Sequence, residues 1–328
     1  MPVISAPHEF NVDDLFVDLR PIFGRDLFLK CEGFNFAGSI KIKAAAEMVT
    51  IAERSGRLRP GMTLVESSSG NLGVALGIIA AHRGYRFICV TDVRCNPLTR
   101  RLMTTLGADV RVVGEPAADE GLLGARIRYV QQLCAADDNH VWLNQYVNRA
   151  NWQAHYRTTA PAIAAQFPDL DVLFIGAGTT GTLMGCARYF KAYHPGVRVV
   201  AVDSVGSVNF GGPAGRRMIP GLGTSVRPAI LAESFVDDVV YVEEPETVRT
   251  CRQLLGHGFL LGGSTGTVIS GALSWLADRS LRAVAISPDL GERYLASVYD
   301  DVWVRETYGD VLRDGESDLC LASPAIVV

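Results

Sequence analysis

Short apolar runs alternate with longer helix-forming segments along most of the chain, and this alternation limits the folds that it can adopt. We expect about nine strands, at residues 27–31, 63–66, 87–91, 109–113, 141–143, 172–175, 197–202, 239–242 and 281–286. The segments between them are long enough for helical crossovers, which favours an α/β protein with mainly parallel sheets. About nine strands exceed what one doubly wound sheet usually needs, so the pattern predicts two sheet domains.

Helices are predicted between these strands. They lie at residues 40–51, 74–83, 97–106, 121–136, 245–256 and 266–278, with a long helix after Asn151 and another after Gly181. Residues 10–24 look irregular, residues 204–227 form a loop-rich insertion, and the tail after Gly309 is first acidic and then apolar. The alternation of predicted strands and helices is least continuous around residues 137–139 and in the 204–227 insertion.

Composition excludes several classes of protein. The 328 residues are 48% hydrophobic and 20% charged, which is enough apolar material for a sizeable core and argues against disorder. A net charge of -4 gives no basis for non-specific nucleic-acid binding. The longest apolar run, residues 72–81, is too short to cross a bilayer, and the N-terminus lacks the features of a signal peptide. Neither nucleic acid nor a membrane is therefore an expected partner.

The seven cysteines do not form a recognisable site. They are scattered, at positions 31, 89, 95, 134, 186, 251 and 320, and none lies in a CxxC pair. Zinc sites and disulfide frameworks usually show regular spacing and even numbers, so we expect no metal site. Free cysteines fit a reducing cytoplasm best.

Lys41 lies at the start of a predicted helix. Asn35 and Gly38 form a loop, Ser39 is a good helix N-cap, and strong helix formers follow from Ala44. The positive end of the helix macrodipole disfavours a cation in the first turn. Together with partial burial, this field lowers the pKa of a lysine and makes its amine a better nucleophile. The alternative is an exposed lysine at a helix start.

Three glycine-bearing loops each precede a predicted helix. The first, residues 67–73, reads Ser-Ser-Ser-Gly-Asn-Leu-Gly, and the third, residues 261–267, reads Leu-Gly-Gly-Ser-Thr-Gly-Thr. Backbone N–H groups and hydroxyls at a helix N-terminus make a ready anion site. Glycines on both sides of Ser264 also let a side chain or ligand pack against bare backbone. Each loop on its own is equally compatible with an ordinary capped helix start.

The second loop, residues 176–182, reads Gly-Ala-Gly-Thr-Thr-Gly-Thr and satisfies the GxGxxG pattern. Asp203 follows at the end of the next predicted strand, as in a dinucleotide-binding fold. A nicotinamide-dependent oxidoreductase is therefore one hypothesis. However, the hydroxyls of Thr179, Thr180 and Thr182 suit a terminal phosphate better than a bridging pyrophosphate. The loop is predicted to bind a phosphate, and the pattern alone leaves the cofactor open.

Together, these segments resemble the fold-type II pyridoxal-phosphate enzymes of the cysteine synthase and cystathionine β-synthase family. The family's lysine motif, substrate loop, phosphate loop and ring-nitrogen serine segment are matched by residues 35–41, 68–73, 178–182 and 262–266. A further signature, Asn-x-x-Asn-x-x-x-His-Tyr-x-Thr-Thr-x-Pro, matches residues 148–161. The matches follow the family's order across residues 27–300.

This resemblance implies a two-domain α/β fold of the tryptophan synthase β type, in which each domain is a mainly parallel twisted sheet flanked by helices. Residues 40–145 would form a smaller, mobile domain that closes over the substrate. Residues 10–39 and 146–310 would form the larger domain, which binds pyridoxal 5'-phosphate, and residues 311–328 a C-terminal tail. The family also implies a cytoplasmic homodimer that acts on small amino-acid substrates.

The resemblance implies roles for single residues as well. Lys41 would hold the cofactor covalently and move the substrate Cα proton, Asn71 would bind the ring hydroxyl, and Ser264 would face the ring nitrogen. The phosphate would lie in the loop formed by Gly178, Thr179, Thr180, Gly181 and Thr182. The substrate carboxylate would bind to Ser68, Ser69, Gly70, Leu72 and Gln145. A neutral serine at the ring nitrogen would leave that nitrogen less protonated, which suits prompt β-elimination.

Departures from the family pattern lie around the lysine and in the substrate loop. Phe36 and Ala37 replace a Pro-Gly pair, Ile42 and Lys43 replace Asp-Arg, and Leu72 replaces a threonine. These changes predict the loss of an ion pair at the lysine turn. They also argue against an ordinary sulfide-using cysteine synthase.

Within the family, several segments resemble the subgroup that joins O-phosphoserine to glutamate on routes to 2,3-diaminopropionate in siderophores and peptide antibiotics. They lie at residues 142–146, 151–156, 206–210, 220–223 and 288–294. For these substrates, Arg126, Arg216 or Arg217 would bind the phosphate leaving group, and Tyr146 would border the glutamate site. Each arginine is also compatible with a solvated surface position.

Other functions stay open at this point. A cysteine synthase, or a β-replacement enzyme with another nucleophile, would share the same motifs. The nicotinamide oxidoreductase and a catalytically lapsed relative that serves as a ligand-binding partner module are the remaining hypotheses. Cofactor colour separates the oxidoreductase from the pyridoxal-phosphate enzyme, and turnover separates an active enzyme from a lapsed relative.

Overall fold

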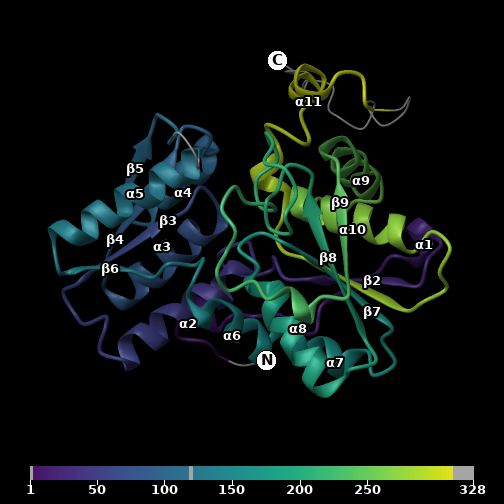
Figure 1. Cartoon of the computed structure of the whole chain (residues 1–328), viewed down its shortest axis with the longest axis horizontal. Coiled ribbons are helices and arrows are strands. Elements are labelled where there is room, and N and C mark those ends of the chain that lie inside the picture. The colour runs from purple at the N-terminus through teal and green to yellow at the C-terminus, as the bar shows by residue number, and fades with distance from the viewer. Residues whose placement is uncertain (1–2, 118–120, 313–328) are drawn as a thin grey trace, which may run out of the picture.

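The computed structural model describes residues 3–117 and 121–312 and contains two sheets, each covered by helices on both faces (Figure 1). This arrangement confirms the predicted α/β fold with two mainly parallel sheets. Across the described residues, no helix combines the length and apolar character needed to cross a membrane.

The larger sheet has six strands in the order β1-β2-β10-β7-β8-β9. The strands are β1 (Phe16–Asp18), β2 (Leu27–Cys31), β7 (Val172–Gly176), β8 (Arg198–Ser204), β9 (Asp238–Val242) and β10 (Ala283–Ser287). Only β1 pairs antiparallel with its neighbour; the other described pairs are parallel. Helices α7 (Thr159–Gln166) and α8 (Gly181–Tyr193) pack on one face, and α9 (Glu244–Gly256) and α10 (Gly263–Trp275) on the other.

The smaller sheet has four parallel strands in the order β5-β4-β3-β6. The strands are β3 (Thr63–Ser67), β4 (Arg86–Asp92), β5 (Asp109–Val113) and β6 (His140–Trp142). Helices α2 (Lys41–Arg54), α3 (Asn71–Arg83) and α4 (Pro97–Thr105) contribute to the core on one face, and α5 (Gly121–Ala136) covers the other. Each sheet therefore has its own hydrophobic core.

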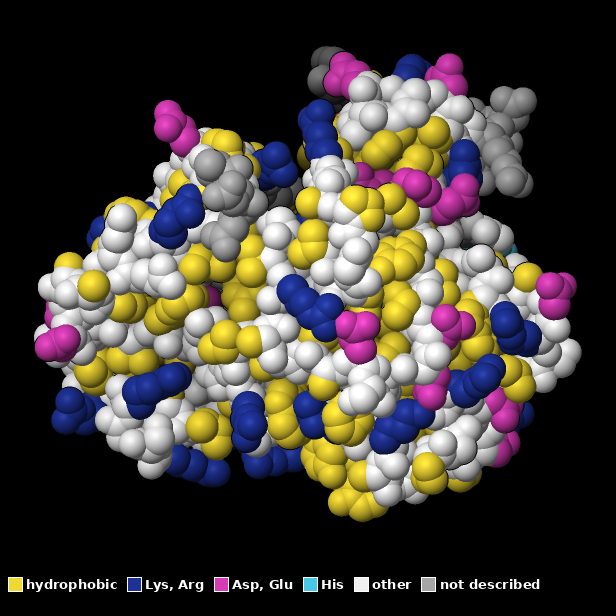
Figure 2. Space-filling model, in the orientation of Figure 1, with side chains coloured by type: hydrophobic (Ala, Val, Ile, Leu, Met, Phe, Trp, Pro, Cys, Tyr) yellow, Lys and Arg dark blue, Asp and Glu magenta, His cyan; other side chains and the backbone are white. Residues whose placement is uncertain are grey.

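Helices α2 and α6 (Arg149–Arg157) lie side by side where the two parts of the molecule meet (Figure 1). The remaining helices are α1 (Arg20–Phe23), α11 (Asp301–Tyr308) and the short 3-10 segments η1 (Pro7–Glu9), η2 (Glu233–Phe235) and η3 (Gly291–Tyr294). Figure 2 shows a notch between the two parts at the upper edge of this face, and charges of both signs scattered over it. Of the C-terminal tail, residues 313–328 lie outside the described residues.

Several predicted elements differ from the structure. Residues 10–24 are not irregular, because they contain β1 and α1; β1 is only three residues long, too short for a visible alternation. The long helix predicted after Asn151 is two helices, which break at Thr158. Ser39 does not cap α2: the N-cap residue is Ile40, and Ser39 instead forms an antiparallel bridge with Asp289.

Candidate active site

Lys41 occupies the first turn of α2, as predicted, and its amine faces the loop between β7 and α8. The Lys41 Nζ lies 3.3 Å from Thr179 Oγ1, which also accepts a hydrogen bond of 3.3 Å from Asn151 Nδ2. Burial lowers the pKa of Lys41 to about 8, although Glu66 and Asp289 oppose this shift. The amine is therefore much closer to neutrality at physiological pH than an ordinary lysine.

Every other lysine of the chain is paired with a carboxylate. The pairs are Lys30 with Glu32, Lys43 with Glu32 and Asp13, and Lys191 with Asp237. No carboxylate in the described part of the chain lies within ion-pair distance of Lys41. Lys41 is thus the lysine whose amine is available to a carbonyl group.

The loop between β7 and α8 combines bare backbone with hydroxyl groups. Thr180 has a left-handed φ of 64°, and α8 begins directly after it. The Thr180 Oγ1 is buried and has no hydrogen-bond partner among the residues that the structure describes. Because a buried hydroxyl is normally paired, this one fits a ligand oxygen held at the N-terminus of α8.

Neighbouring segments leave no room for side chains at the glycines of this loop. A Cβ atom on Gly178 would lie 2.8 Å from the Gly221 carbonyl oxygen, and one on Gly181 would lie 2.1 Å from Asn151 Oδ1. Asn209 Nδ2 donates to the Gly178 carbonyl oxygen at 3.2 Å and holds the loop in place. The result is a narrow, uncharged cradle beside Lys41, which fits the phosphate of pyridoxal phosphate.

His155 connects the cradle to the buried charges behind it. Its Nε2 lies 3.3 Å from Thr182 Oγ1, and its Nδ1 lies 3.1 Å from Thr159 Oγ1. Burial, followed by the charges of Lys43 and Lys41, holds the pKa of His155 well below its ordinary value. The imidazole ring is therefore neutral, and it links the hydroxyls of Thr182 and Thr159 through its two nitrogens.

The predicted loss of an ion pair at the lysine turn is wrong. Lys43 Nζ lies 2.6 Å from Asp13 Oδ1 and 2.8 Å from Glu32 Oε2. Burial disfavours the charge on Lys43, but the two carboxylates outweigh it and raise the pKa of Lys43. The partners come from segments before the lysine turn, so the turn keeps its ionic support.

Asn71 is the first residue of α3, and both the nitrogen and the oxygen of its side-chain amide form hydrogen bonds. Its Nδ2 donates to Asp289 Oδ2 at 2.8 Å, and its Oδ1 accepts from Arg293 Nη1. Arg293 also donates to the carbonyl oxygen of Ala37, in the loop before Lys41. The second Nδ2 hydrogen of Asn71 has no partner among the described residues, which fits the predicted contact with the ring hydroxyl.

Ser264 is buried in the first turn of α10, not in a loop ahead of it. A Cβ atom on Gly221, whose φ is 115°, would lie 2.1 Å from Ser264 Oγ. Tyr294 lies behind this segment, and its hydroxyl donates to Asp289 Oδ2 at 2.7 Å. A Cβ atom on Gly262 would lie 2.0 Å from Asp289 Oδ1. Close packing against bare backbone at this segment is therefore confirmed.

The residues predicted for the substrate carboxylate surround the N-terminus of α3. Ser68 Oγ accepts from backbone N–H groups of the same loop at 2.9 and 3.3 Å, while Ser69 and Gly70 are partly exposed. Gln145 Nε2 donates to a carbonyl oxygen of this loop at 3.0 Å. The Leu72 side chain is buried in the core, so only its backbone N–H is available to a ligand.

The three candidate arginines differ in environment. Arg126 is only 7% exposed, and its Nε lies 3.1 Å from Asp92 Oδ2, so a solvated position is wrong for this residue. Burial raises the pKa of Tyr146 to about 12, and the charge of Arg126 opposes this shift. Arg217 is partly buried within the 204–227 insertion, whereas Arg216 is exposed. Arg126 and Arg217 therefore remain the candidates.

The residues that sequence reasoning missed are Asp289, Arg293, Tyr294, Asn151 and Asn209. All of them are buried or partly buried. Four hydrogen-bond directly to predicted site residues or their loops, and the fifth, Tyr294, donates to Asp289. Four of them lie in segments already matched to the family, at residues 148–161 and 288–294. For these four residues, a polar side chain within a family-specific segment is the sequence signal that could have identified them.

Residues 16–286 match the family described as pyridoxal-phosphate dependent enzyme. The chain belongs to this family, and its cofactor is pyridoxal 5'-phosphate. It is 40% identical over 283 residues to the N-(2-amino-2-carboxyethyl)-L-glutamate synthase of Ralstonia nicotianae, covering 85% of this chain and 84% of that protein. The synthase of the same name from Cupriavidus metallidurans is 38% identical over 298 residues, covering 88% and 87%. The crystal structure of O-ureido-L-serine synthase superposes with a TM-score of 0.83 at 31% identity, covering 92% of this chain and 96% of that one.

The oxidoreductase hypothesis is therefore wrong. In addition, Asp203 is fully buried at the end of β8, and its Oδ1 accepts from the Ser204 N–H at 2.9 Å. Burial raises the pKa of Asp203 to about 6. A carboxylate that binds a ribose has to reach the ligand, and Asp203 instead supports the start of the 204–227 insertion.

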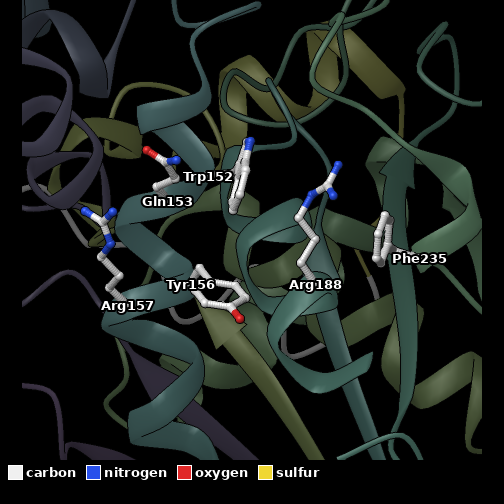
Figure 3. Close-up of a pocket in the computed structure, with 6 residues that line it drawn as sticks. All are labelled: Trp152, Gln153, Tyr156, Arg157, Arg188 and Phe235. Carbon is white, nitrogen blue, oxygen red and sulfur yellow. The ribbon is translucent and has the colours of Figure 1, made fainter. Parts of the chain in front are cut away.

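A separate hollow lies between α6, α8 and η2 (Figure 3). Its volume is about 420 Å³, and its lining consists of Trp152, Gln153, Tyr156, Arg157, Arg188 and Phe235. The Arg188 guanidinium lies between two rings, 4.9 Å from the Trp152 centroid and 4.3 Å from that of Phe235. None of the predicted site residues lines this hollow, so it is distinct from the site at Lys41.

Attachment of the cofactor to Lys41 should accelerate as the pH rises through about 8, because the neutral amine is the nucleophile. The rate of the absorbance change on mixing pyridoxal phosphate with cofactor-free protein would be followed from about pH 6 to about pH 10. A free lysine derivative, whose amine titrates near about 10.4, is the control. A protein midpoint that coincides with this control would contradict the lowered pKa.

Proposed function

We propose that this enzyme catalyses a β-replacement in which L-glutamate displaces phosphate from O-phospho-L-serine. The product would be N-(2-amino-2-carboxyethyl)-L-glutamate, a source of 2,3-diaminopropionate for a siderophore or peptide natural product. The observation that carries the chemistry is the unpaired Lys41 amine beside an uncharged phosphate cradle. The substrates are supported by the two relatives that bear the name of this synthase.

Each residue of the site can carry out a separate part of the reaction. Bound pyridoxal phosphate supplies an electron sink for the Cα–H bond that has to break. Lys41, neutral above about pH 8, takes the Cα proton as general base. The N-terminus of α3, with Ser68, Ser69 and Gly70, holds the substrate carboxylate. Phosphate then leaves the β-carbon with the electron pair of its bond, the deprotonated glutamate nitrogen forms the new bond there, and Lys41 returns the proton to Cα.

The leaving group needs a cation, because a phosphate carries more charge than an acetate. We propose Arg126 and Arg217 for this role. Arg126 is already paired with Asp92, whereas Arg217 makes its described hydrogen bond to a backbone carbonyl oxygen and so keeps donors for a ligand. Tyr146 would border the space for the glutamate side chain.

Purified enzyme should form N-(2-amino-2-carboxyethyl)-L-glutamate and phosphate from O-phosphoserine and glutamate. O-acetylserine as donor, and sulfide or other amino acids as nucleophiles, would be tested in parallel by mass spectrometry of the products. The rate should rise from neutral to mildly alkaline pH, since the glutamate amine has to lose a proton before it attacks. Cysteine formation from O-acetylserine without a glutamate product would identify a cysteine synthase instead. No turnover with any pair would identify a lapsed relative.

Arg126→Ala and Arg217→Ala should each lower turnover of O-phosphoserine by roughly tenfold to one-hundredfold, which is the usual worth of a charge-assisted hydrogen bond. Cofactor colour should be retained. Arg216→Ala is the matched control, because it removes an exposed arginine from the same insertion. An Arg217 variant that retains the activity of the Arg216 control does not bind the leaving group.

We also propose that residues 40–145 close over the substrate as a unit, and that the enzyme is a cytoplasmic homodimer. The separate hydrophobic cores of the two sheets support relative motion of the two parts. The six described cysteines are free, which supports a reducing compartment. Light scattering on the purified protein would measure the oligomeric state, and a monomeric mass would contradict the dimer.

A further inference from the structure

Glu244, the first residue of α9, holds part of the 204–227 insertion through its side chain. Its Oε1 accepts from the backbone N–H of Met218 at 2.8 Å and from that of Ile219 at 2.7 Å, and its Oε2 accepts from Met218 at 3.0 Å. The Tyr308 hydroxyl donates to Oε2 at 2.9 Å. Both oxygens of one carboxylate therefore attach the insertion to α9 and to α11.

A small hydrophobic cluster reinforces this attachment. Ile219 is buried together with Val248 of α9 and Val304 of α11. Ile219 also contacts the start of α10, where a Cβ atom added to Gly263 would lie 2.5 Å from Ile219 Cγ2. Because Gly263 directly precedes Ser264, the anchored segment is fixed against the helix start that carries the predicted ring contact.

Arg217 directly precedes the anchored segment, and its side chain lies beside Gly223. A Cβ atom added to Gly223 would lie 2.8 Å from Arg217 Nε. The Gly223 N–H donates to the carbonyl oxygen of Ala177 at 2.8 Å, and Ala177 precedes Gly178 of the phosphate cradle. Gly223 therefore connects Arg217 to the loop that forms the cradle.

The Glu244 carboxylate holds the backbone after Arg217 without neutralising the arginine. Within residues 3–117 and 121–312, Arg217 forms no ion pair, and its described hydrogen bond goes to the carbonyl oxygen of Gly206. Hydrogen bonds to an ionised carboxylate are roughly twice as strong as those between neutral groups, so Glu244 is a firm anchor for two backbone N–H groups. The guanidinium of Arg217 keeps its charge for a ligand.

We propose that Glu244 is a positioning residue that sets Arg217 for the phosphate group of O-phospho-L-serine, so that α9 and α11 help to determine the affinity for the donor. This role rests on the proposed function, in which Arg217 binds the leaving group. A loop that has to become ordered on binding loses affinity through the cost of that ordering. Glu244 fixes the two residues after Arg217 before the donor arrives, and it does so without contacting the phosphate.

Glu244→Ala should raise the KM for O-phosphoserine roughly tenfold, the usual effect of losing a charge-assisted hydrogen bond. The KM for glutamate and the cofactor absorbance should not change. Glu244→Gln keeps one acceptor oxygen and should lie between Glu244→Ala and wild type, and it decides the test if Glu244→Ala does not fold. Glu246→Ala is the matched control, because it removes an exposed glutamate of the same helical turn that pairs with Arg249. Calorimetry of the holoenzyme with inorganic phosphate should show the same loss of affinity without turnover.

The double variant Glu244→Ala/Arg217→Ala tests whether Glu244 acts through Arg217. Its KM for O-phosphoserine and its affinity for phosphate should equal those of Arg217→Ala alone, and a further loss of about tenfold would mean that the two residues act independently, which overturns the proposal. If Arg217→Ala weakens phosphate binding while both Glu244 variants behave like Glu246→Ala, the role of Glu244 is overturned and that of Arg217 stands.

Two other results concern the proposed function itself. If Arg217→Ala leaves phosphate binding unchanged, Arg217 does not bind the leaving group, and the role of Glu244 is overturned with it. A wild-type enzyme that does not turn over O-phosphoserine contradicts the proposed function, and phosphate calorimetry of the same variants then decides whether Glu244 positions Arg217.

Discussion

Lys41→Ala should abolish covalent attachment of the cofactor and lower turnover by about 10³-fold or more, because we propose the same side chain as both the attachment point and the general base. The variant should still fold, since the one described hydrogen bond of the Lys41 side chain is to Thr179 and no ion pair is lost with it. Loss of the yellow colour on gel filtration would report the loss of attachment.

Borohydride reduction of the wild-type holoenzyme, followed by peptide mapping, should place the cofactor on Lys41. Lys43 is the nearest competitor, but its amine is held by Asp13 and Glu32. Lys191→Ala is the control variant, because it removes a lysine that is paired with Asp237; it should keep both colour and turnover. An adduct on Lys43, or a Lys41→Ala protein that keeps covalently bound cofactor, would refute the assignment.

Much of the fold could be predicted because each strand and helix carries its own periodic signal. The nine predicted strands are all present, since a buried parallel strand is apolar along its whole length. The short edge strand β1 was missed because three residues are too few to show a period. Ser39 was misassigned because a capping rule considers only the local chain, whereas Ser39 pairs with Asp289, far away in the sequence.

The difference between local sequence patterns and contacts far apart in the sequence also applies to the candidate site. Lys41, Asn71 and Ser264 can be proposed from the sequence because each lies in a short motif at a helix start. The bond from Asn71 to Asp289 joins residues 218 positions apart. Such a contact depends on how the two sheets are placed relative to each other, which no local pattern encodes. The ionic partners of Lys43 escaped prediction for the same reason, because Asp13 and Glu32 approach it only in the folded chain.

Gly221→Ala should weaken cofactor binding and displace the hydroxyl of Ser264. Gly221 has a φ of 115°, and an added Cβ atom would lie 2.1 Å from Ser264 Oγ. The short Ser264 side chain can relieve this contact only by rotating away, so the proposed hydrogen bond to the cofactor ring would be lost. We expect roughly tenfold weaker cofactor retention, in addition to a destabilisation of about 1–3 kcal/mol from the unfavourable backbone conformation.

Gly61→Ala is the control that separates weaker cofactor retention from the destabilisation caused by the backbone conformation. Gly61 also has a positive φ, of 88°, but an added Cβ atom there meets nothing within 4 Å. This variant should show a similar loss of thermal stability with unchanged cofactor affinity and an unchanged absorbance spectrum. Cofactor release measured during dialysis, together with thermal unfolding of the cofactor-free proteins, would compare the pair. Equal cofactor retention in both variants would mean that Gly221 matters only for backbone conformation, and that the 219–224 segment does not hold Ser264 against the cofactor.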